Sequence, residues 1–414
     1  MIIEVRMGEK TVGRLAEDLQ TGQIYFQYEK EWIQSGLNIS PFHLEFHTIA
    51  QSHLNKKFHG LHGVFADSLP DYWGMTVLAE RLRRAGLEPE RVSPLVKLSY
   101  LGQRAMGALE YHPQGGSKEE LEVISLAQAD HDASLLMEGK KIEGKTSEIL
   151  SFLVEGSSAG GAKPKVHAYV KGDEIMIGGT PKSGFESWII KLSDIPQGHK
   201  DSRQSGATEY AFMKMASIAG IEVPAIQLFQ CESGKKERVL FGIKRFDRHE
   251  GKKIHMHSLS GLLQISHQEL SIAYEDFILR GVELTENHET AKEIFRRCVF
   301  NRIVGNCDDH AKNFAFLLKG KEWILSPSFD ITSSPGMNNR NTHAMTVNGS
   351  RTPTLKDLLT LSRKAEISEA GQIIEASMEA VEHWDKISLE AGLKAGNRAR
   401  IKENITKNCQ ALRR

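Results

Sequence analysis

Apolar residues recur at helical spacing towards the end of the segment that precedes residue 305. Phe295, Val299 and Ile303 lie four residues apart, which predicts an amphipathic helix that ends shortly afterwards. Two short apolar runs follow at residues 314–318 and 323–325, separated by a lysine–glycine–lysine turn, and predict a hairpin. The residues between the helix end and the hairpin, 306–313, are mostly polar, and we call them the polar cluster. The apolar elements on either side can hold this cluster in place.

The same patterns predict the order of elements along the rest of the chain. Alternating short apolar stretches over residues 1–40 indicate a small antiparallel sheet, and Pro70 favours a packed loop over residues 65–74. A further hairpin is predicted over residues 101–111, and a linker signal follows at residues 112–116. Strands are predicted at 166–170, 188–191 and 239–243, and helical segments at 75–85, 119–155, 208–218, 271–305 and 355–412.

Length and composition narrow the class of protein. The chain has 414 residues, enough for two or three domains, and its 40% apolar and 26% charged residues are typical of globular proteins. Charges balance at 53 basic and 53 acidic residues, so the net charge gives no reason to expect a polyanionic ligand. The basic run after residue 394 is interpreted as a solvated helix face, with a nucleic-acid contact as the less favoured alternative.

The four cysteines have no spacing typical of a zinc site or a disulfide framework, which fits a reducing compartment. No run approaches the roughly 20 apolar residues of a membrane span. The first residues also lack the apolar core of a signal peptide. We therefore expect a cytoplasmic protein that makes no membrane contact.

The chemistry of the polar cluster is that of phosphoryl transfer. Protein kinases use an aspartate as base, an asparagine five residues later as a metal ligand, and a second aspartate after a hairpin as another metal ligand. Asp308, Asn313 and Asp330 reproduce that order and the first spacing. Asp309 is a competitor for the base, and only the five-residue spacing to Asn313 favours Asp308. The Asp-x-x-x-x-Asn pattern is weak evidence when taken alone. The predicted helix before it, and the predicted hairpin and Phe-Asp pair after it, make it more specific.

A glycine-rich stretch at residues 156–165 leads into the strand predicted at 166–170. Successive backbone amides in such a turn can bind phosphate oxygens. The Walker A pattern is a near miss, because Gly156 and Gly161 have the right separation but Ala162 stands where lysine is required. A plain glycine-rich turn is the alternative interpretation.

Further along, Lys191 ends a predicted strand, which resembles the kinase strand whose lysine binds the α- and β-phosphates. Glu209, in the first turn of the next predicted helix, could hold that lysine or be a solvated carboxylate at a helix start. The strand at 239–243 leads into Lys244 and Phe246, where a kinase hinge would read the adenine edge. His255 and His257 share one face of a strand, but no ligand partner is close in sequence, so a metal site there is disfavoured.

With these motifs in order, the sequence resembles the HipA family of bacterial toxin–antitoxin Ser/Thr kinases over nearly the whole chain. The resemblance rests on residues 67–71, 107–109, 245–248, 308–314 and 345–349, of which the run 308–314 is the most specific. It implies an α+β, two-lobed protein-kinase-like fold with a small, mainly β N-terminal subdomain (1–112), a kinase N-lobe (113–247) and a largely α-helical C-lobe (248–414).

The resemblance also implies an activity and partners. It implies transfer of the ATP γ-phosphate, with Mg²⁺, to a seryl hydroxyl of a host protein. Family members with a known substrate act on aminoacyl-tRNA synthetases and inhibit translation. A HipB-like DNA-binding antitoxin is the implied partner, so that DNA would be reached only through the antitoxin complex.

Family roles fall on matching positions of this chain. Asp308 is the implied base, Asn313 and Asp330 the metal ligands, and Lys191 the phosphate-binding lysine. Ser158 is the implied autophosphorylation site that switches the enzyme off, although the adjacent Ser157 leaves the choice open. Lys244 departs from the family, in which an acidic residue is common there. The implied ATP-binding set comprises Lys191, Ser158, Ala159, Gly160, Gly161, Lys244, Phe246 and Glu209.

Two alternatives belong to other functional classes. A catalytically silent kinase-like co-repressor would act with a DNA-binding partner, but it has no physical need for the complete set of Asp308, Asn313, Asp330 and Lys191. A small-molecule phosphotransferase would share the base-and-metal chemistry. The N-terminal region of about 110 residues is interpreted as a protein-binding module, which makes a small-molecule phosphotransferase the less favoured function.

Overall fold

The structure is a computed structural model, and it divides the chain into two compact units that are described separately below. The first holds residues 1–202, 229–264 and 317–321, and the second holds 203–228, 265–316 and 322–414. The predicted divisions after residues 112 and 247 stay predictions. The residues that the structure describes are 1–70, 72–115, 123–138, 163–179, 183–192, 204–233, 236–266, 269, 272–334 and 341–413.

Alternating apolar residues at the start of the chain form the predicted antiparallel sheet. Ile3 and Val5 are fully buried, whereas the neighbouring Ile2 is exposed and Glu4 between them is only partly buried, as the two-residue period of a strand requires. The strand order is β4-β3-β2-β1-β5. Its strands are β1 (Ile2–Met7), β2 (Lys10–Glu17), β3 (Ile24–Tyr28), β4 (Gln51–Ser52) and β5 (Leu109–His112).

Two predictions in this region are wrong. The expected hairpin over 101–111 is instead the end of a helix followed by β5, which pairs with β1 at the start of the chain. Pro94 at the first helical turn and the Ser93 cap account for that helix. The loop expected over 65–74 gives way to a helix two residues after Pro70. The helices here are α1 (Lys30–Ser35), η1 (Lys56–Phe58), α2 (Gly63–Ala66), α3 (Tyr72–Arg84) and α4 (Pro94–Leu101).

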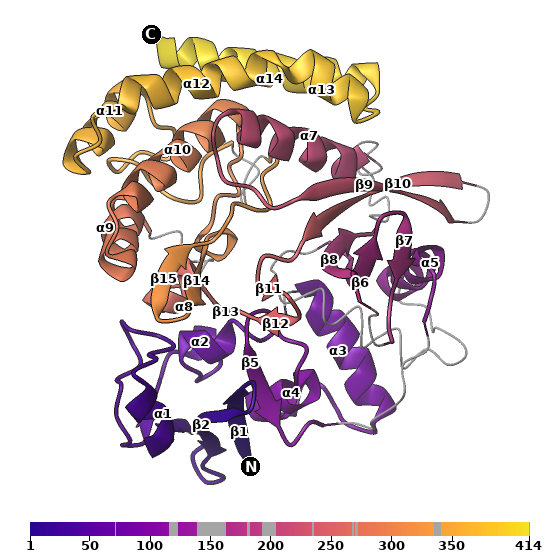
Figure 1. The fold of residues 1–414 in the computed structure, drawn as a ribbon, viewed down its shortest axis with the longest axis vertical. Helices are drawn as coiled ribbons and strands as arrows, with labels where there is room; N and C mark the ends of the chain where they lie inside the picture. The colour runs from indigo at the N-terminus through magenta and orange to yellow at the C-terminus, as the bar shows by residue number, and fades with distance from the viewer. Residues whose placement is uncertain are drawn as a thin grey trace. The chain divides into compact units, whose positions relative to one another are not determined.

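A second five-stranded sheet has the order β7-β6-β8-β10-β9, and β9 and β10 are its longest arrows in Figure 1. The strands predicted at 166–170, 188–191 and 239–243 are confirmed as parts of β6, β8 and β10. The helix predicted over 119–155 is confirmed for α5 (Leu126–Met137), and residues 119–122 and 139–155 lie outside the described ranges. The prediction is wrong for residues 123–125, where Ile124 forms a β-bridge with Ile177 before Ser125 caps the helix. The strands are β6 (Lys165–Lys171), β7 (Glu174–Met176), β8 (Glu186–Lys191), β9 (Ile226–Ser233) and β10 (Lys236–Lys244).

Within the first unit, Asp67 joins the N-terminal region to a segment nearly 200 residues later. Its carboxylate accepts hydrogen bonds from the Ser258 backbone N–H (2.7 Å) and hydroxyl (2.6 Å), and it lies 2.7 Å from His257 Nδ1. Ser258 in turn caps a short helix. The elements of this segment are β11 (Arg248–His249), β12 (Lys252–Lys253), β13 (His255–Ser258) and α8 (Leu259–Leu263).

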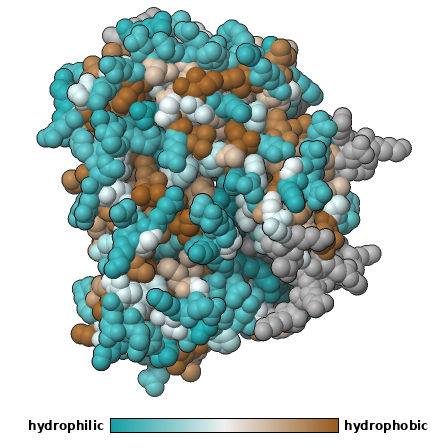
Figure 2. Space-filling view, in the orientation of Figure 1, coloured by the Kyte–Doolittle hydropathy of each residue, from teal (hydrophilic) through white to brown (hydrophobic). Residues whose placement is uncertain are grey.

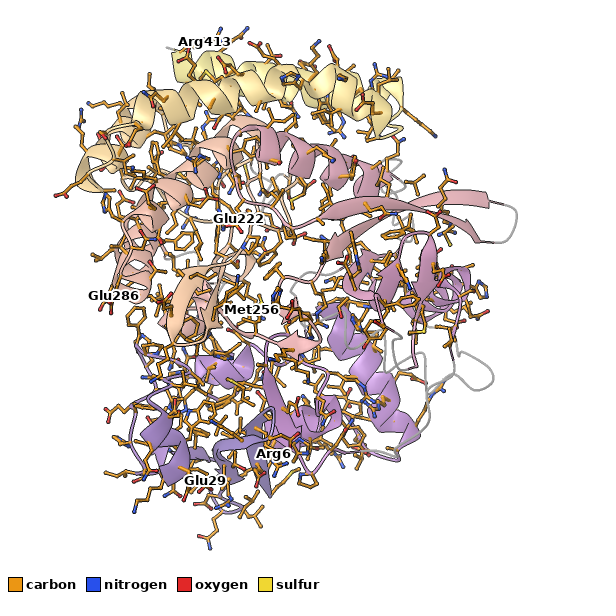
Figure 3. All side chains as sticks on the ribbon, in the orientation of Figure 1. Arg6, Glu29, Glu222, Met256, Glu286 and Arg413 are labelled. Carbon is orange, nitrogen blue, oxygen red and sulfur yellow. The ribbon has the colours of Figure 1, made fainter. Side chains whose placement is uncertain are left out.

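Glycines also allow the backbone of the N-terminal region to pack directly against the backbone of β13 and α8. A Cβ atom on Gly63 in α2 would overlap with the carbonyl oxygen of Gly261 in α8. A Cβ atom on Gly107 would lie 2.9 Å from the backbone nitrogen of Met256, which Figure 3 labels. Since these neighbours are backbone atoms, no side-chain rotation could make room. The N-terminal region is thus an integral part of the first unit.

The second unit is mostly helical, as predicted for residues 271–305 and 355–412. Figure 1 shows α10 beside α9, and α10 also packs against α12 and α14. Phe212 and Trp384 stack with ring centroids 5.3 Å apart. The predicted hairpin over 314–325 is confirmed. The elements that lie wholly or partly in this unit are α7 (Ser205–Ile218), α9 (Tyr274–Thr285), α10 (Glu289–Val304), η3 (Ala311–Asn313), β14 (Ala315–Lys319), β15 (Glu322–Leu325), α11 (Leu355–Lys364), α12 (Ala370–Glu382), α13 (Trp384–Glu390) and α14 (Ala395–Arg413). Of these, β14 continues into the first unit from Leu317.

The basic run near the C-terminus lies mainly on α14. Arg400, Lys402 and Lys407 are exposed, and Lys402 and Lys407 pair with Asp385 and Glu403. Arg413 is also exposed and is labelled in Figure 3, while hydrophilic residues cover the upper edge of Figure 2. These features fit a solvated helix face. Over the described ranges, no helix has both the length and the apolar character needed to cross a membrane.

Candidate active site

The polar cluster begins where α10 ends, as the sequence predicts. Gly305 adopts a φ of 70°, a left-handed conformation that glycine reaches without strain, and its N–H donates to the Asn301 carbonyl. The N–H of Asn306 donates to the same carbonyl (3.0 Å). Most of α10 is buried, so the loop that follows is carried by a well-packed helix rather than by a mobile surface element.

Asp308 and Asn313 lie together in this loop. The side-chain Nδ2 of Asn313 donates to the backbone carbonyl of Asp308 (2.9 Å), and the Asn313 backbone N–H donates to the His310 carbonyl (2.9 Å). The first bond settles which side of the Asn313 amide carries its oxygen. Asp308 is half-buried and Asn313 is buried. The pair thus offers an accessible carboxylate and an oriented amide within one tight loop.

Asp309, by contrast, is fully enclosed. Its side chain has no exposed area, and one carboxylate oxygen lies 2.9 Å from the Tyr274 hydroxyl and 2.9 Å from His343 Nδ1. The other oxygen accepts a hydrogen bond from the Ala344 backbone N–H (2.8 Å). A buried charge needs such partners, because an uncompensated carboxylate away from water costs several kcal/mol.

The charge of Asp309 affects its neighbours. Burial raises the pKa of the Tyr274 hydroxyl well above its usual range, and the nearby negative charge raises it further. The Cys298 thiol responds in the same way, since burial and then the Asp309 charge raise its pKa. Both groups therefore stay protonated at neutral pH, and the tyrosine remains a hydrogen-bond donor.

Cys307, next to Asp308, is also held in its neutral form. Burial and then the charge of Asp309 raise the pKa of its thiol to about 11. A thiolate is the reactive form of cysteine. The position of Cys307 beside the proposed base therefore does not make it a nucleophile at neutral pH.

Asp330 lies in a segment that is bonded at one end to the first residue of β14 and at the other end to the loop that follows α10. Four residues before it, Ser326 N donates to the Ala315 carbonyl (2.9 Å), and four residues after it, the Ser334 carbonyl accepts from Cys307 N (3.0 Å). Because an extended chain spans at most about 3.6 Å per residue, Asp330 stays within about 14 Å of both anchors.

The backbone of Asp330 is also unusual. Its φ is 58°, in the left-handed region that residues other than glycine adopt at a cost of about 1 kcal/mol or more, and its side chain is half-buried. Such conformations concentrate at functional sites. The surroundings of Asp330 must therefore enforce its conformation, and its predicted convergence with Asp308 and Asn313 stays a prediction.

The remaining predicted residues are divided between the units. Lys191 ends β8, where it is paired in register with Lys165 and Phe241, and Lys244 ends β10 with its ammonium group 2.6 Å from Glu186. Both belong to the first unit, as does the half-buried Phe246. Ser157, Ser158, Ala159, Gly160 and Gly161 lie outside the described residues.

Glu209 belongs to the second unit, and its expected place in the first helical turn is wrong. The helix begins three residues earlier than expected, at Ser205, so Glu209 lies in the second turn. It is only 3% exposed, which also excludes the alternative of a solvated carboxylate at a helix start. The predicted pairing of Glu209 with Lys191 stays a prediction.

Metal ligation by histidine finds no support in the described part of the chain. There, no group of three or more His, Cys, Asp or Glu side chains is arranged to hold a metal ion. His257 lies within hydrogen-bond distance of Asp67 through Nδ1 (2.7 Å) and of the Ser40 hydroxyl through Nε2 (3.0 Å). His255 Nε2 lies 2.9 Å from the Ile39 carbonyl. These contacts explain why both histidines are buried.

Tyr274 and His343 contribute to this loop although no pattern in the sequence predicts it. They contact Asp309 from 35 and 34 residues away, and no spacing pattern links them to the loop. The run 345–349 next to His343 was noted as a motif, and it was the one available signal that this segment matters.

Comparison with known proteins defines the class. The structure resembles that of a complex described as "Shewanella oneidensis MR-1 Toxin Antitoxin System HipA, HipB and its operator DNA complex". The TM-score is 0.70 at 16% sequence identity, over 99% of this chain and 96% of that chain. The predicted α+β, protein-kinase-like fold is thereby confirmed.

Family models then identify the lineage. Residues 3–112 match the HipA N-terminal domain, and residues 157–397 match the HipA-like C-terminal domain. The chain belongs to the HipA family.

Two full-length relatives illustrate the relationship. The chain is 26% identical over 419 aligned positions to "Putative kinase Y4dM" of Sinorhizobium fredii, which covers 92% of this chain and 90% of that protein. It is 20% identical over 360 positions to "Serine/threonine-protein kinase toxin HipA" of Shewanella oneidensis, covering 80% and 75% of the two chains.

Proposed function

We propose that this chain is an ATP-dependent serine/threonine protein kinase that transfers the γ-phosphate of ATP to a seryl hydroxyl of a host protein. The observation that carries this proposal is the loop at the end of α10, in which the Asn313 amide is bonded to the backbone of Asp308. Phosphoryl transfer depends mainly on positioning and electrostatics, and this loop supplies an accessible carboxylate on a rigid support.

Asp308 is the base in this proposal, and the surroundings of the two adjacent aspartates support that choice. A base must reach the substrate hydroxyl through a hydrogen bond. Asp309 is fully buried and its oxygens are engaged by Tyr274, His343 and Ala344, so a substrate could not approach it. Asp308 is half-buried and remains accessible.

The donors near this loop suit Mg²⁺. That ion prefers oxygen ligands and is usually held by one or two carboxylates together with substrate phosphates, rather than by a dedicated protein cage. The bond from Asn313 Nδ2 to the Asp308 carbonyl leaves the amide oxygen on its other side, and Asp330 has a left-handed backbone with a φ of 58°. Asn313 and Asp330 would hold Mg²⁺, which would neutralise charge on the transferred phosphoryl group.

The ATP contacts are assigned to the first unit and to the glycine-rich stretch. Lys191 would bind the phosphates from its place at the end of β8, a strand flanked by β6 and β10. The backbone at Lys244 and Phe246 would contact the adenine. Ser158, Ala159, Gly160 and Gly161 would cradle the phosphates, and Glu209 would hold Lys191.

The partners are proposed by analogy. The similar Shewanella structure contains HipA, HipB and operator DNA, so we assign this chain a HipB-like DNA-binding antitoxin as partner and place its DNA contact within that complex. The proposed target is an aminoacyl-tRNA synthetase, whose phosphorylation would inhibit translation. Phosphorylation of Ser158 would switch the kinase off, because a phosphate of charge near −2 would repel the nucleotide phosphates.

Replacement of the base tests the central claim. Asp308→Ala should abolish transfer of label from γ-labelled ATP to proteins of a lysate, while the thermal unfolding temperature stays near that of the wild type. Asp385→Ala is the matched control, since this exposed aspartate in the same unit pairs with Lys402 at the surface. Undiminished labelling by Asp308→Ala would disprove the assignment of the base.

A second experiment tests the self-inactivation. Ser158→Ala should remain active after prolonged incubation with ATP and Mg²⁺, whereas the wild type should lose activity as it becomes phosphorylated. Ser157→Ala is the control and should behave like the wild type. Phosphate found by mass spectrometry only at Ser157 would move the role to that residue.

A further inference from the structure

Asp309 gathers three donors that come from two distant parts of the second unit. Tyr274 is the first residue of α9, whereas His343 and Ala344 belong to the segment that precedes α11. All three lie within 2.9 Å of its carboxylate oxygens. The proposed mechanism gives no task to this carboxylate, although it is adjacent in sequence to the base.

The same contacts clamp the backbone on the other side of Asp308. Besides its bond to Asp309, the Ala344 N–H lies 3.1 Å from the Cys307 carbonyl, and the Cys307 N–H donates to the Ser334 carbonyl (3.0 Å). The peptide unit before Asp308 is therefore tied to Ala344 outside the loop, and the carbonyl of the peptide unit after it accepts from Asn313 within the loop. Rotation of the Asp308 backbone would break several of these bonds together.

A second layer of bonds holds the donors themselves. Asn301 Nδ2 donates to the Tyr274 hydroxyl oxygen (3.2 Å), and Asn306 Nδ2 donates to Asn301 Oδ1 (3.1 Å). Arg351 Nη1 donates to the carbonyls of both His343 (3.0 Å) and Ala344 (2.6 Å). The donors that face Asp309 are thus held in place from behind, as a precisely aimed site requires.

The segment after His343 is a preformed turn. Val347 and Ser350 exchange two backbone hydrogen bonds of 2.9 and 2.8 Å, and Asn348 and Gly349 between them have φ values of 50° and 78°. Two positive φ values with an Asn-Gly pair are typical of a type I′ turn. Residues 345–349 therefore form part of a rigid turn. The Asp309 side chain connects the residues just before this turn, His343 and Ala344, to the loop that carries Asp308.

We infer that Asp309 is a positioning residue, which holds the Asp308 carboxylate in its productive orientation by binding Tyr274, His343 and Ala344. The inference rests on the proposed function, in which Asp308 is the base. Asp309 does not touch the substrate. Its effect is exerted through the backbone that it shares with Asp308.

Variants of the two side-chain donors test this role better than variants of Asp309, which would leave a hole in a buried network. His343→Leu removes the donor, whereas His343→Asn keeps an N–H group near the position of Nδ1. Tyr274→Phe removes only a hydroxyl group. Tyr210→Phe is the matched control, because it removes the same hydroxyl group from a tyrosine of the same unit, on α7, with the Lys214 ammonium over its ring.

The measured quantities are kcat and KM for ATP from ADP release by the full chain with Mg²⁺ and an excess of a serine-containing protein as phosphate acceptor, together with the thermal unfolding temperature. A misplaced catalytic group can cost up to about 100-fold in rate, so we expect His343→Leu and Tyr274→Phe to lower kcat about 10- to 100-fold. KM for ATP should stay within about twofold, because the nucleotide contacts assigned above lie elsewhere. His343→Asn should recover most of kcat, and Tyr210→Phe should match the wild type.

Three outcomes are decisive. An unchanged kcat in both His343→Leu and Tyr274→Phe, with an active wild type, would overturn the role of Asp309 and leave the proposed function intact. A failure of His343→Asn to exceed His343→Leu in kcat, at equal thermal stability, would overturn the hydrogen-bond argument in favour of simple packing. A wild type that releases no ADP would instead refute the proposed function.

Discussion

The buried ion cluster around Asp247 provides the sharpest test of how the first unit is held together. Asp247 accepts hydrogen bonds from Arg245 Nε (2.9 Å) and Nη2 (2.8 Å), from Arg248 Nη1 (2.8 Å) and from the backbone N–H of Gly107 (2.7 Å). The side chains of Asp247 and Arg245 have no exposed area. The cluster joins the N-terminal region to the residues that follow β10, including the proposed adenine contact at Phe246.

Asp247→Asn keeps the shape of the side chain and removes its charge. The buried guanidinium of Arg245 would lose its counter-ion, and an amide NH₂ group would face other donors. Breaking a buried ion pair in this way costs about 3–5 kcal/mol. Since domains are stable by about 5–15 kcal/mol, we expect a large loss in the free energy of unfolding.

Urea unfolding followed by tryptophan fluorescence measures this loss. Glu186→Gln is the matched control, because it breaks an ion pair at the surface: Glu186 pairs with Lys244, the last residue of β10, and half of the Glu186 side chain is exposed. Such surface pairs contribute about 1 kcal/mol or less. A loss below about 1 kcal/mol for Asp247→Asn, or equal losses for the two variants, would refute the reasoning about burial.

The pH dependence of this effect has a definite sign. Burial alone would raise the pKa of Asp247, but the charges of Arg245 and Arg248 outweigh it and hold the pKa well below its usual range. A lowered pKa contributes stability that is fully present above the unfolded-state value of about 4 and is lost as pH falls below it. The difference between wild type and Asp247→Asn should therefore shrink only below about pH 4.

Two further predictions concern the stability of the first unit. Gly63→Ala should lower the free energy of unfolding by at least about 2 kcal/mol, because its Cβ atom would overlap with the Gly261 backbone. Gly371→Ala in α12 is the control and should be neutral or stabilising, because a Cβ atom there would meet no other atom within 4 Å. Equal effects of the two variants in urea unfolding would contradict the packing. Burial lowers the pKa of His62 and of His255 to about 4, so the folded state binds fewer protons than the unfolded state, and stability should fall as pH decreases from 6.5 to 4. In thermal unfolding, His255→Gln should show a weaker decline over this pH range, and an unchanged decline would contradict the burial argument.

Local periodicity predicts the elements that depend on local contacts. The spacing of Phe295, Val299 and Ile303 placed the end of α10 correctly, because all three side chains are fully buried in that helix. The hairpin over 101–111 failed for the opposite reason, since β5 pairs with a strand about 100 residues earlier. Glu209 was misplaced by one turn because a helix boundary depends on capping and packing that extend beyond the apolar pattern.

The sequence alone determined which residue types stand at the end of α10, and the five-residue spacing of Asp308 and Asn313 was enough to indicate phosphoryl-transfer chemistry. It could not distinguish the environments of Asp308 and Asp309, because adjacent aspartates are chemically identical until the chain folds. The tertiary structure made that distinction by bringing Tyr274 and His343 onto Asp309 from 35 and 34 residues away. Burial and hydrogen bonding are properties of the packed chain, so they decide which of two identical side chains can meet a substrate.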